Sequence, residues 1–230
     1  MSTELSSILG ELRNAETRLR GLEKLEAGRF RGRGAMASNY LGDPNPLVRN
    51  QALQCVRSER AVDDGTLNKV RESLKNSDSL LKIDAIEYFV GSRYDKAMSE
   101  IAPLIDDKDG LVSAYAIWAA TEFKWKLLEG KITCKSPKST YELVSVLEYR
   151  VRVLNSNESL SELKSIFCGT SGSEKAFASA ALRRIALENK KWIPEIKRLY
   201  LQSLKKPNLA LGLMEAISDD LREVEFAQAR

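Results

Sequence analysis

An apolar pattern recurs along the chain every 31–33 residues, and it limits the folds that the sequence can adopt. Three segments align: 47–56 (LVRNQALQCV), 80–89 (LLKIDAIEYF) and 111–120 (LVSAYAIWAA). Each begins with an aliphatic pair, and each carries alanine followed by Leu or Ile at the same offset. A period of this length is typical of arrays in which each repeat is one small unit that packs on its neighbours.

The apolar residues within these segments follow the spacing of an α-helix. Val48, Ala52, Cys55 and Val56 lie at i, i+4, i+7 and i+8, which places them on one face. Short polar turns precede the segments, and Asp109 in the third turn (DDKDG) is expected to cap a helix rather than bind calcium. A further amphipathic segment precedes each one, for example 66–74 and 94–105. We therefore expect two helices per repeat.

Two weaker copies follow at 176–185 and 208–217, with a predicted helix over 192–204 before the last. Residues 121–157 interrupt the period. There we expect the preceding helix to continue through Phe123 and Trp125, and a loop and a helix over 140–154 to follow. We predict one continuous domain with four parts. They are an N-terminal helix with a basic Gly/Arg linker (1–34), repeats 1–3 (35–120), an insertion with an extra helix (121–157) and repeats 4–5 (158–230).

The N-terminal segment 3–27 carries a leucine stripe that predicts one helix, either a cap for the array or an arm folded as a helical hairpin. Gly28 then reads as its C-terminal cap. The stretch GRFRGRG follows as a basic connection.

The segment 43–56 (DPNPLVRNQALQCV) resembles the second helix of a HEAT repeat in its Asp-Pro turn, its Leu-Val-Arg triplet and its central alanine. The later copies depart from it, because Lys82 and Ser113 stand in place of the arginine. The resemblance covers 35–120 well and 158–220 loosely. It implies an all-α fold, an α–α superhelix of about five helix pairs with an N-terminal helix and one insertion. A fold of this kind leaves the function open.

Composition argues against common catalytic sites. The chain has no histidine, which excludes Ser-His-Asp and Cys-His chemistry and removes the usual general base. The three cysteines form no metal-binding pair; Cys55 is expected to be buried and Cys134 exposed. No apolar run approaches the roughly 20 residues of a membrane span. We expect a cytoplasmic protein that is not an enzyme and has no cofactor, metal, membrane contact or small-molecule substrate.

The predicted binding surface follows from the resemblance, since the second helices of a HEAT-like stack line its concave face. Tyr115, Trp118 and Glu122 lie at i, i+3 and i+7, and exposed aromatic residues are frequent binding hot spots. The alternative is that residues 121–157 fold back and bury both rings in the core. The predicted protein-binding residues are Gln51, Gln54, Asp84, Glu87, Tyr115, Trp118, Glu122 and Arg183.

Charge suggests the kind of partner. Residues 35–120 carry 10 basic and 13 acidic side chains, a net charge of −3, which suits a protein with a basic surface. An adaptor would fit, and so would an inhibitor, such as an immunity protein that neutralises a cationic nuclease toxin.

The alternative partner is a nucleic acid. Residues 183–206 have a local charge of +6, which exceeds the +4 of the whole chain. Basic side chains that are simply exposed to solvent, with no binding role, would give the same local charge. HEAT-like DNA glycosylases and phycobilin lyases are further analogies, but the clustered tryptophans beside a catalytic aspartate that mark the glycosylases are missing. The predicted nucleic-acid-binding residues are Arg29, Arg31, Arg33, Arg184, Lys190, Lys191, Lys197 and Arg198.

Overall fold

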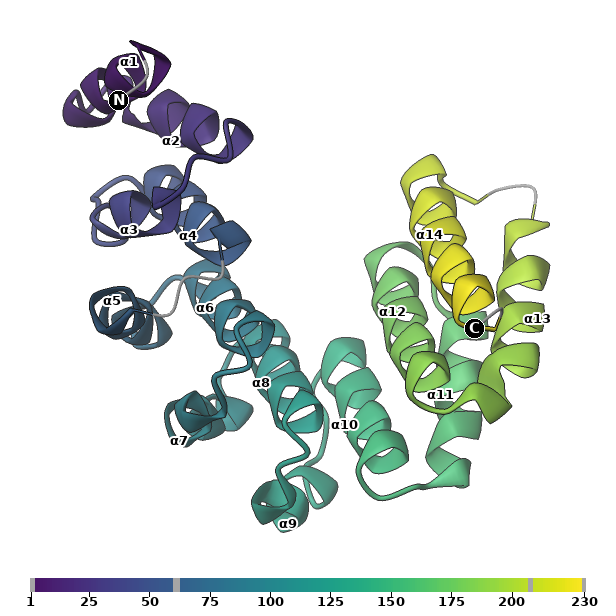
Figure 1. Cartoon of the computed structure of the whole chain (residues 1–230). Helices are drawn as coiled ribbons and strands as arrows, with labels where there is room; N and C mark the ends of the chain where they lie inside the picture. The colour runs from purple at the N-terminus through teal and green to yellow at the C-terminus, as the bar shows by residue number, and fades with distance from the viewer. Residues whose placement is uncertain (1–2, 60–62, 207–208, 229–230) are drawn as a thin grey trace. The chain divides into compact units, whose positions relative to one another are not determined.

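The computed structural model of the chain describes residues 3–59, 63–206 and 209–228, and every regular element within these ranges is a helix (Figure 1). The predicted all-α class is confirmed. The chain divides into two compact units, Met1–Ala119 and Ala120–Arg230. Within the described ranges, no helix combines the length and the apolar character that crossing a bilayer requires.

Unit 1 alternates between two rows of helices (Figure 1). Helix α2 contacts α4 and α4 contacts α6; likewise α3 contacts α5, and α5 contacts α7. Within each pair, α3 packs on α4 and α5 packs on α6. Short 3-10 turns flank α7, and α8 crosses the boundary into unit 2. The bounds are α1 Thr3–Arg13, α2 Arg18–Ala27, α3 Arg33–Ser38, α4 Pro46–Glu59, α5 Asp64–Leu74, α6 Ser79–Gly91, α7 Met98–Ile101 and α8 Gly110–Glu122.

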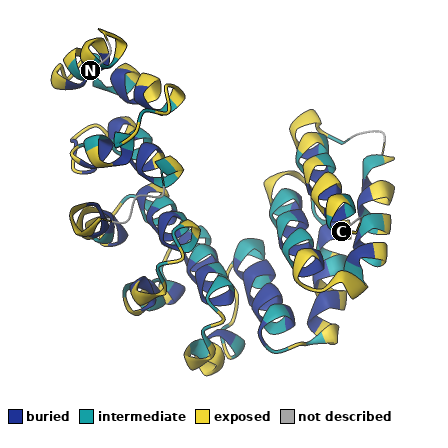
Figure 2. Cartoon of the chain, in the orientation of Figure 1, coloured by how far each residue is buried: buried dark blue, intermediate teal, exposed yellow. Residues whose placement is uncertain are grey.

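The three aligned segments lie in α4, α6 and α8, and their apolar stripes form core. Val48, Ala52, Cys55 and Val56 are all buried, and the buried residues run along α4 and α6 in Figure 2. The alanines at the shared offset, Ala52, Ala85 and Ala116, have no exposed surface. Asp109 caps α8 as predicted, since its Oδ1 accepts a hydrogen bond from the Leu111 amide at 2.9 Å.

The N-terminal segment differs from the predicted single helix, because α1 ends at Arg13 and α2 begins at Arg18. The Asn14 side chain accepts a hydrogen bond from the Glu16 amide, which is an Asx turn and competes with helical pairing. The Thr17 hydroxyl then donates to the Glu11 carbonyl. Helices α1 and α2 pack on each other, so the segment is the helical hairpin that stood as the alternative.

The stretch after α8 also differs from expectation. The predicted extension of this helix through Phe123 and Trp125 is wrong, since α8 ends at Glu122 and Lys124 has a left-handed backbone with φ of 53°. The Trp125 amide donates to the Ala120 carbonyl at 2.9 Å, which closes the helix end. A short 3-10 turn and α9 (Glu129–Thr133) follow.

Unit 2 repeats the alternation. Helices α10, α12 and α14 contact one another in turn, while α11 packs on α10 and α12, and α13 packs on α12 and α14. Their facing side chains form one core, including Leu163, Phe167, Leu182 and Tyr200. The last predicted repeat copy begins at residue 208, which lies outside the described residues. The bounds are α10 Thr140–Arg152, α11 Asn157–Gly169, α12 Gly172–Glu188, α13 Ile193–Leu204 and α14 Leu211–Gln228.

Candidate functional site

A polar groove opens on unit 1 across the row of α2, α4 and α6. Its volume is about 540 Å³. Gln54 lies exposed at the groove, whereas Gln51 is half-buried and donates its amide to Glu26 Oε2 at 2.5 Å. The lining residues are Glu26 from α2, Gln54, Arg57 and Ser58 from α4, and Glu87, Tyr88 and Gly91 from α6.

The predicted acidic residues of this row, Asp84 and Glu87, are half-buried and share one arginine. Arg57 donates to Asp84 Oδ1 at 2.7 Å and pairs with Glu87 Oε2 at 2.5 Å. Burial raises the pKa of Asp84 to about 6, and the nearby Arg57 only partly offsets that effect. Arg57 was not predicted from the sequence. Its spacing from Asp84, slightly less than one repeat, could have indicated that the two side chains lie on neighbouring helices.

The groove still carries excess negative charge. Glu26 and Glu87 line the groove together with Arg57, and Asp84, which pairs with Arg57, adds a third carboxylate beside it. Arg33 reaches the hydroxyl of the lining residue Ser58 at 3.1 Å. Glu59, which follows Ser58 in the chain, accepts from the Gly32 and Gly34 amides at 2.6 and 2.5 Å, so these four carboxylates outnumber the two arginines. A cation would therefore be attracted to this surface.

Tyr115 and Trp118 lie on α8, and both are half-buried. Their rings meet edge to face, with centroids 5.8 Å apart and an interplanar angle of 79°. The two rings therefore hold each other in place. They are neither the fully exposed anchors of one hypothesis nor the fully buried core residues of the other.

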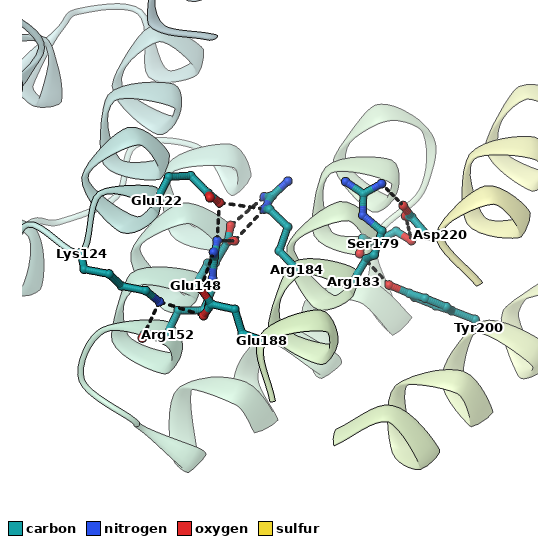
Figure 3. Close-up of polar contacts among 10 residues, drawn as sticks. All are labelled: Glu122, Lys124, Glu148, Arg152, Ser179, Arg183, Arg184, Glu188, Tyr200 and Asp220. Atoms are coloured by element: carbon teal, nitrogen blue, oxygen red, sulfur yellow. Dashed lines mark hydrogen bonds and ion pairs between the residues drawn. The ribbon is translucent and has the colours of Figure 1, made fainter. Parts of the chain in front are cut away.

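Two predicted residues, Glu122 and Arg183, belong to unit 2, and each is engaged in ion pairs (Figure 3). Glu122 accepts from Arg152 at 2.5 Å. Arg183 lies 2.9 Å from Glu223 and 3.4 Å from the buried Asp220. Both side chains therefore have local partners, so a binding role for either would have to compete with these pairs.

At the centre of unit 2 lies Glu148, a carboxylate with no exposed surface (Figure 3). Arg184 donates to both of its oxygens at 2.7 Å, and Arg152 donates to Oε1 at 2.7 Å. Burial would raise the pKa of Glu148, but the two guanidinium groups outweigh burial and hold it below the ordinary value. Arg152 also pairs with Glu188 at 2.9 Å, and Lys124 reaches Glu188 at 2.8 Å. The helices α10 and α12 are thus joined by a buried ionic cluster.

A second buried group ties α12 to α13 and α14 (Figure 3). The Ser179 hydroxyl donates to Asp220 at 2.5 Å, and the Tyr200 hydroxyl donates to the Ser179 carbonyl at 2.7 Å. Burial raises the pKa of Asp220. Because these contacts satisfy polar groups between packed helices, they are explained by packing.

The predicted nucleic-acid-binding residues fall into two groups. Arg184 and Lys197 are held in ion pairs, with Glu148 and with Glu225 respectively. Lys191 lies 4.6 Å from the Trp192 ring centroid. The structure therefore removes Arg184 from the basic surface that the charge count suggested. The exposed members are Arg29, Arg31, Lys190, Lys191 and Arg198.

The described residues contain no group of three or more Cys, Asp or Glu side chains arranged to hold a metal ion. Cys55 is buried, and burial raises its pKa to about 12, whereas Cys134 is exposed. The expected burial of Cys55 and exposure of Cys134 are confirmed. No protein-family model matches the chain, and no curated protein matches it either.

Proposed function

We propose that the chain is a HEAT-like α-solenoid and that it binds a protein with a basic surface through the groove of unit 1. The regular alternation of helices within each unit supports the solenoid. In such an array the row α2, α4 and α6 would supply the binding face.

The observation that carries the proposed function is the acidic groove lined from three successive helices of one row. Residues at equivalent repeat positions, Gln54 and Glu87, both reach it. A partner with lysine or arginine side chains would gain from the excess negative charge, mainly through faster association. An adaptor and an inhibitor of a cationic toxin both fit this chemistry.

The experiment that tests this function uses a basic protein captured from the native cell, then purified for calorimetric titration. Gln54→Arg adds a cation at an exposed groove position, so we expect affinity to fall about tenfold or more. The matched control is Gln202→Arg, which makes the same change at an exposed position of α13. Equal affinity of both variants and the unmodified protein would refute the groove as the binding surface.

A nucleic acid is the second candidate partner, favoured by the exposed Lys190, Lys191 and Arg198. Binding to a short duplex or single strand should then weaken steeply with salt. The double variant Lys190→Glu and Arg198→Glu should abolish it. Absence of binding at low salt would eliminate this candidate.

A further inference from the structure

A small pocket of unit 2 lies between the α10–α11 connection and the α12–α13 connection. The ends of α10 and α12 contribute Arg152 and Glu188 to its lining, and the two connections contribute Asn155, Lys191 and Trp192. The volume is about 160 Å³, well below the roughly 300–1,000 Å³ of pockets that take drug-sized molecules. A pocket of this size suits one compact group, such as a single ring system.

Arg152 brings a buried hydrogen-bond donor to this pocket. Only 5% of its side chain is exposed. Its guanidinium makes four hydrogen bonds, one to Glu122, one to Glu148 and two to Glu188 (Figure 3). A guanidinium carries five N–H donors, so one N–H is left over within the part of the chain that the structure describes. An unused donor at this depth favours a ligand that presents an acceptor, such as a ring carbonyl oxygen.

Two asparagine side chains, Asn155 and Asn157, line the same pocket and are exposed. Asn155 has a left-handed backbone with φ of 61°, which asparagine tolerates better than most residues. The Ser156 amide closes this turn by donating to the Arg150 carbonyl at 3.0 Å. Among the described residues, neither asparagine amide has a hydrogen-bonding partner. Each amide offers both a donor and an acceptor, so the two can bind the mixed polar edge of a heterocyclic ring.

An aromatic ring and exposed cations complete the pocket. Trp192 is half-buried, and the Lys191 ammonium lies 4.6 Å from its ring centroid. Lys190 and Lys191 are both exposed, and neither has a carboxylate within ion-pair distance in the described ranges. Lys164, by contrast, is paired with Glu195 at 2.7 Å. Aromatic side chains stack on bases and lysines neutralise phosphates, so this combination is typical of a nucleotide-binding surface.

We propose that this pocket receives one unpaired base of a single-stranded nucleic acid, an inference that rests on the second candidate function given above. The base stacks on Trp192, and its edge is bound by the two asparagine amides and by the remaining Arg152 donor. Lys190 and Lys191 bind the adjoining phosphates. Because Lys191 is exposed, its side chain can move from the indole ring to a phosphate. A neutral sugar could use the ring and the amides, but it would leave the two lysines without a role.

The probes are a labelled oligothymidylate and the same strand annealed to oligoadenylate, titrated by fluorescence anisotropy at low, fixed salt. We expect the single strand to bind about tenfold or more tightly than the duplex, because paired bases are stacked within the double helix and cannot enter the pocket. Equal affinity for strand and duplex would overturn the base pocket and leave nucleic-acid binding in place. Failure of both probes would instead eliminate the nucleic-acid candidate itself, and this inference with it.

Uncharged variants then assign the residues. Trp192→Leu should weaken single-strand binding about tenfold or more, because the stacking surface is lost. Since Trp192 also packs against the core of unit 2, Asn157→Leu offers a second route: Asn157 is exposed, so the fold should persist, and loss of its hydrogen bond should weaken binding about threefold. The matched control is Gln202→Leu, at an exposed position of α13 outside the pocket. Duplex binding, which depends on charge, should be the same in all three variants. Single-strand affinities of Trp192→Leu and Asn157→Leu equal to that of Gln202→Leu would contradict the proposal.

Discussion

Replacement of Glu148 by glutamine tests the energetic role of the buried cluster in unit 2. The change keeps the shape of the side chain and removes its charge. Arg152 would retain Glu122 at 2.5 Å and Glu188 at 2.9 Å. Arg184 also lies near Glu122, whose oxygen is 3.9 Å from its Nε. Both guanidinium groups would thus lose the central carboxylate that they share.

The magnitude follows from the loss of this shared, fully buried charge. Removal of one member of a buried ion pair costs about 3–5 kcal/mol, because the remaining charge stays desolvated. We expect Glu148→Gln to lose that much unfolding free energy, measured by urea denaturation followed by circular dichroism. The double variant Glu148→Leu with Arg184→Met should recover most of the loss, since apolar residues of similar volume replace buried pairs at little cost.

The control is the exposed pair Glu72 and Lys75, whose atoms lie 2.9 Å apart on the surface. Glu72→Gln should change stability by less than about 0.5 kcal/mol. The pKa of Glu148 lies below its ordinary 4.5, so its stabilisation is present above that pH and is lost as the pH falls. The deficit of Glu148→Gln should therefore shrink in acid. A loss below about 1 kcal/mol at pH 7 would refute the reasoning.

Three further predictions concern single side chains. The pKa of Asp84 is raised from 3.8 to about 6, so its ionisation costs stability as the pH rises from about 4 to about 6. Asp84→Asn should remove this pH dependence of the unfolding free energy, measured by urea denaturation. The unfolding free energies of the two proteins should diverge by up to about 3 kcal/mol over this pH range, and parallel profiles of stability against pH would contradict the raised pKa of Asp84. Trp118→Ala should lose about 1–3 kcal/mol, because the ring is half-buried against Tyr115; thermal denaturation showing no loss would mean that this contact contributes nothing. Cys55 should resist a thiol reagent in the native protein while Cys134 reacts, as mass spectrometry would show; equal labelling would contradict the burial of Cys55.

The helices of the repeats could be predicted because local and tertiary preferences agree there. In α4 the stripe through Val48, Ala52, Cys55 and Val56 has helical spacing, and the same residues are the ones that the fold buries. The break at 14–17 could not be predicted from leucine spacing, since Asn14 and Thr17 decide it through short-range hydrogen bonds. The end of α8 at Glu122 has a similar origin, because the left-handed residue that closes it is Lys124 rather than glycine.

The candidate sites were harder to predict from the sequence, because the net charge of a segment does not show which charged side chains pair in the fold. Residues 183–206 looked uniformly basic, yet Arg184 folds inward onto Glu148, 36 residues earlier in the chain. The acidic pair Asp84 and Glu87 looked unopposed, yet Arg57 reaches both.

Lys175 shows the converse, since nothing in SGSEK distinguishes a buried lysine from an exposed one. Its burial depends on the packing of α11 against α12 and on the Phe167 ring, which are tertiary facts. The Lys175 ammonium donates to the Phe167 carbonyl near the C-terminal end of α11, where helix carbonyls carry partial negative charge. A contact between two helices therefore stabilises the buried charge, and such a contact cannot be deduced from the residue types in the segment.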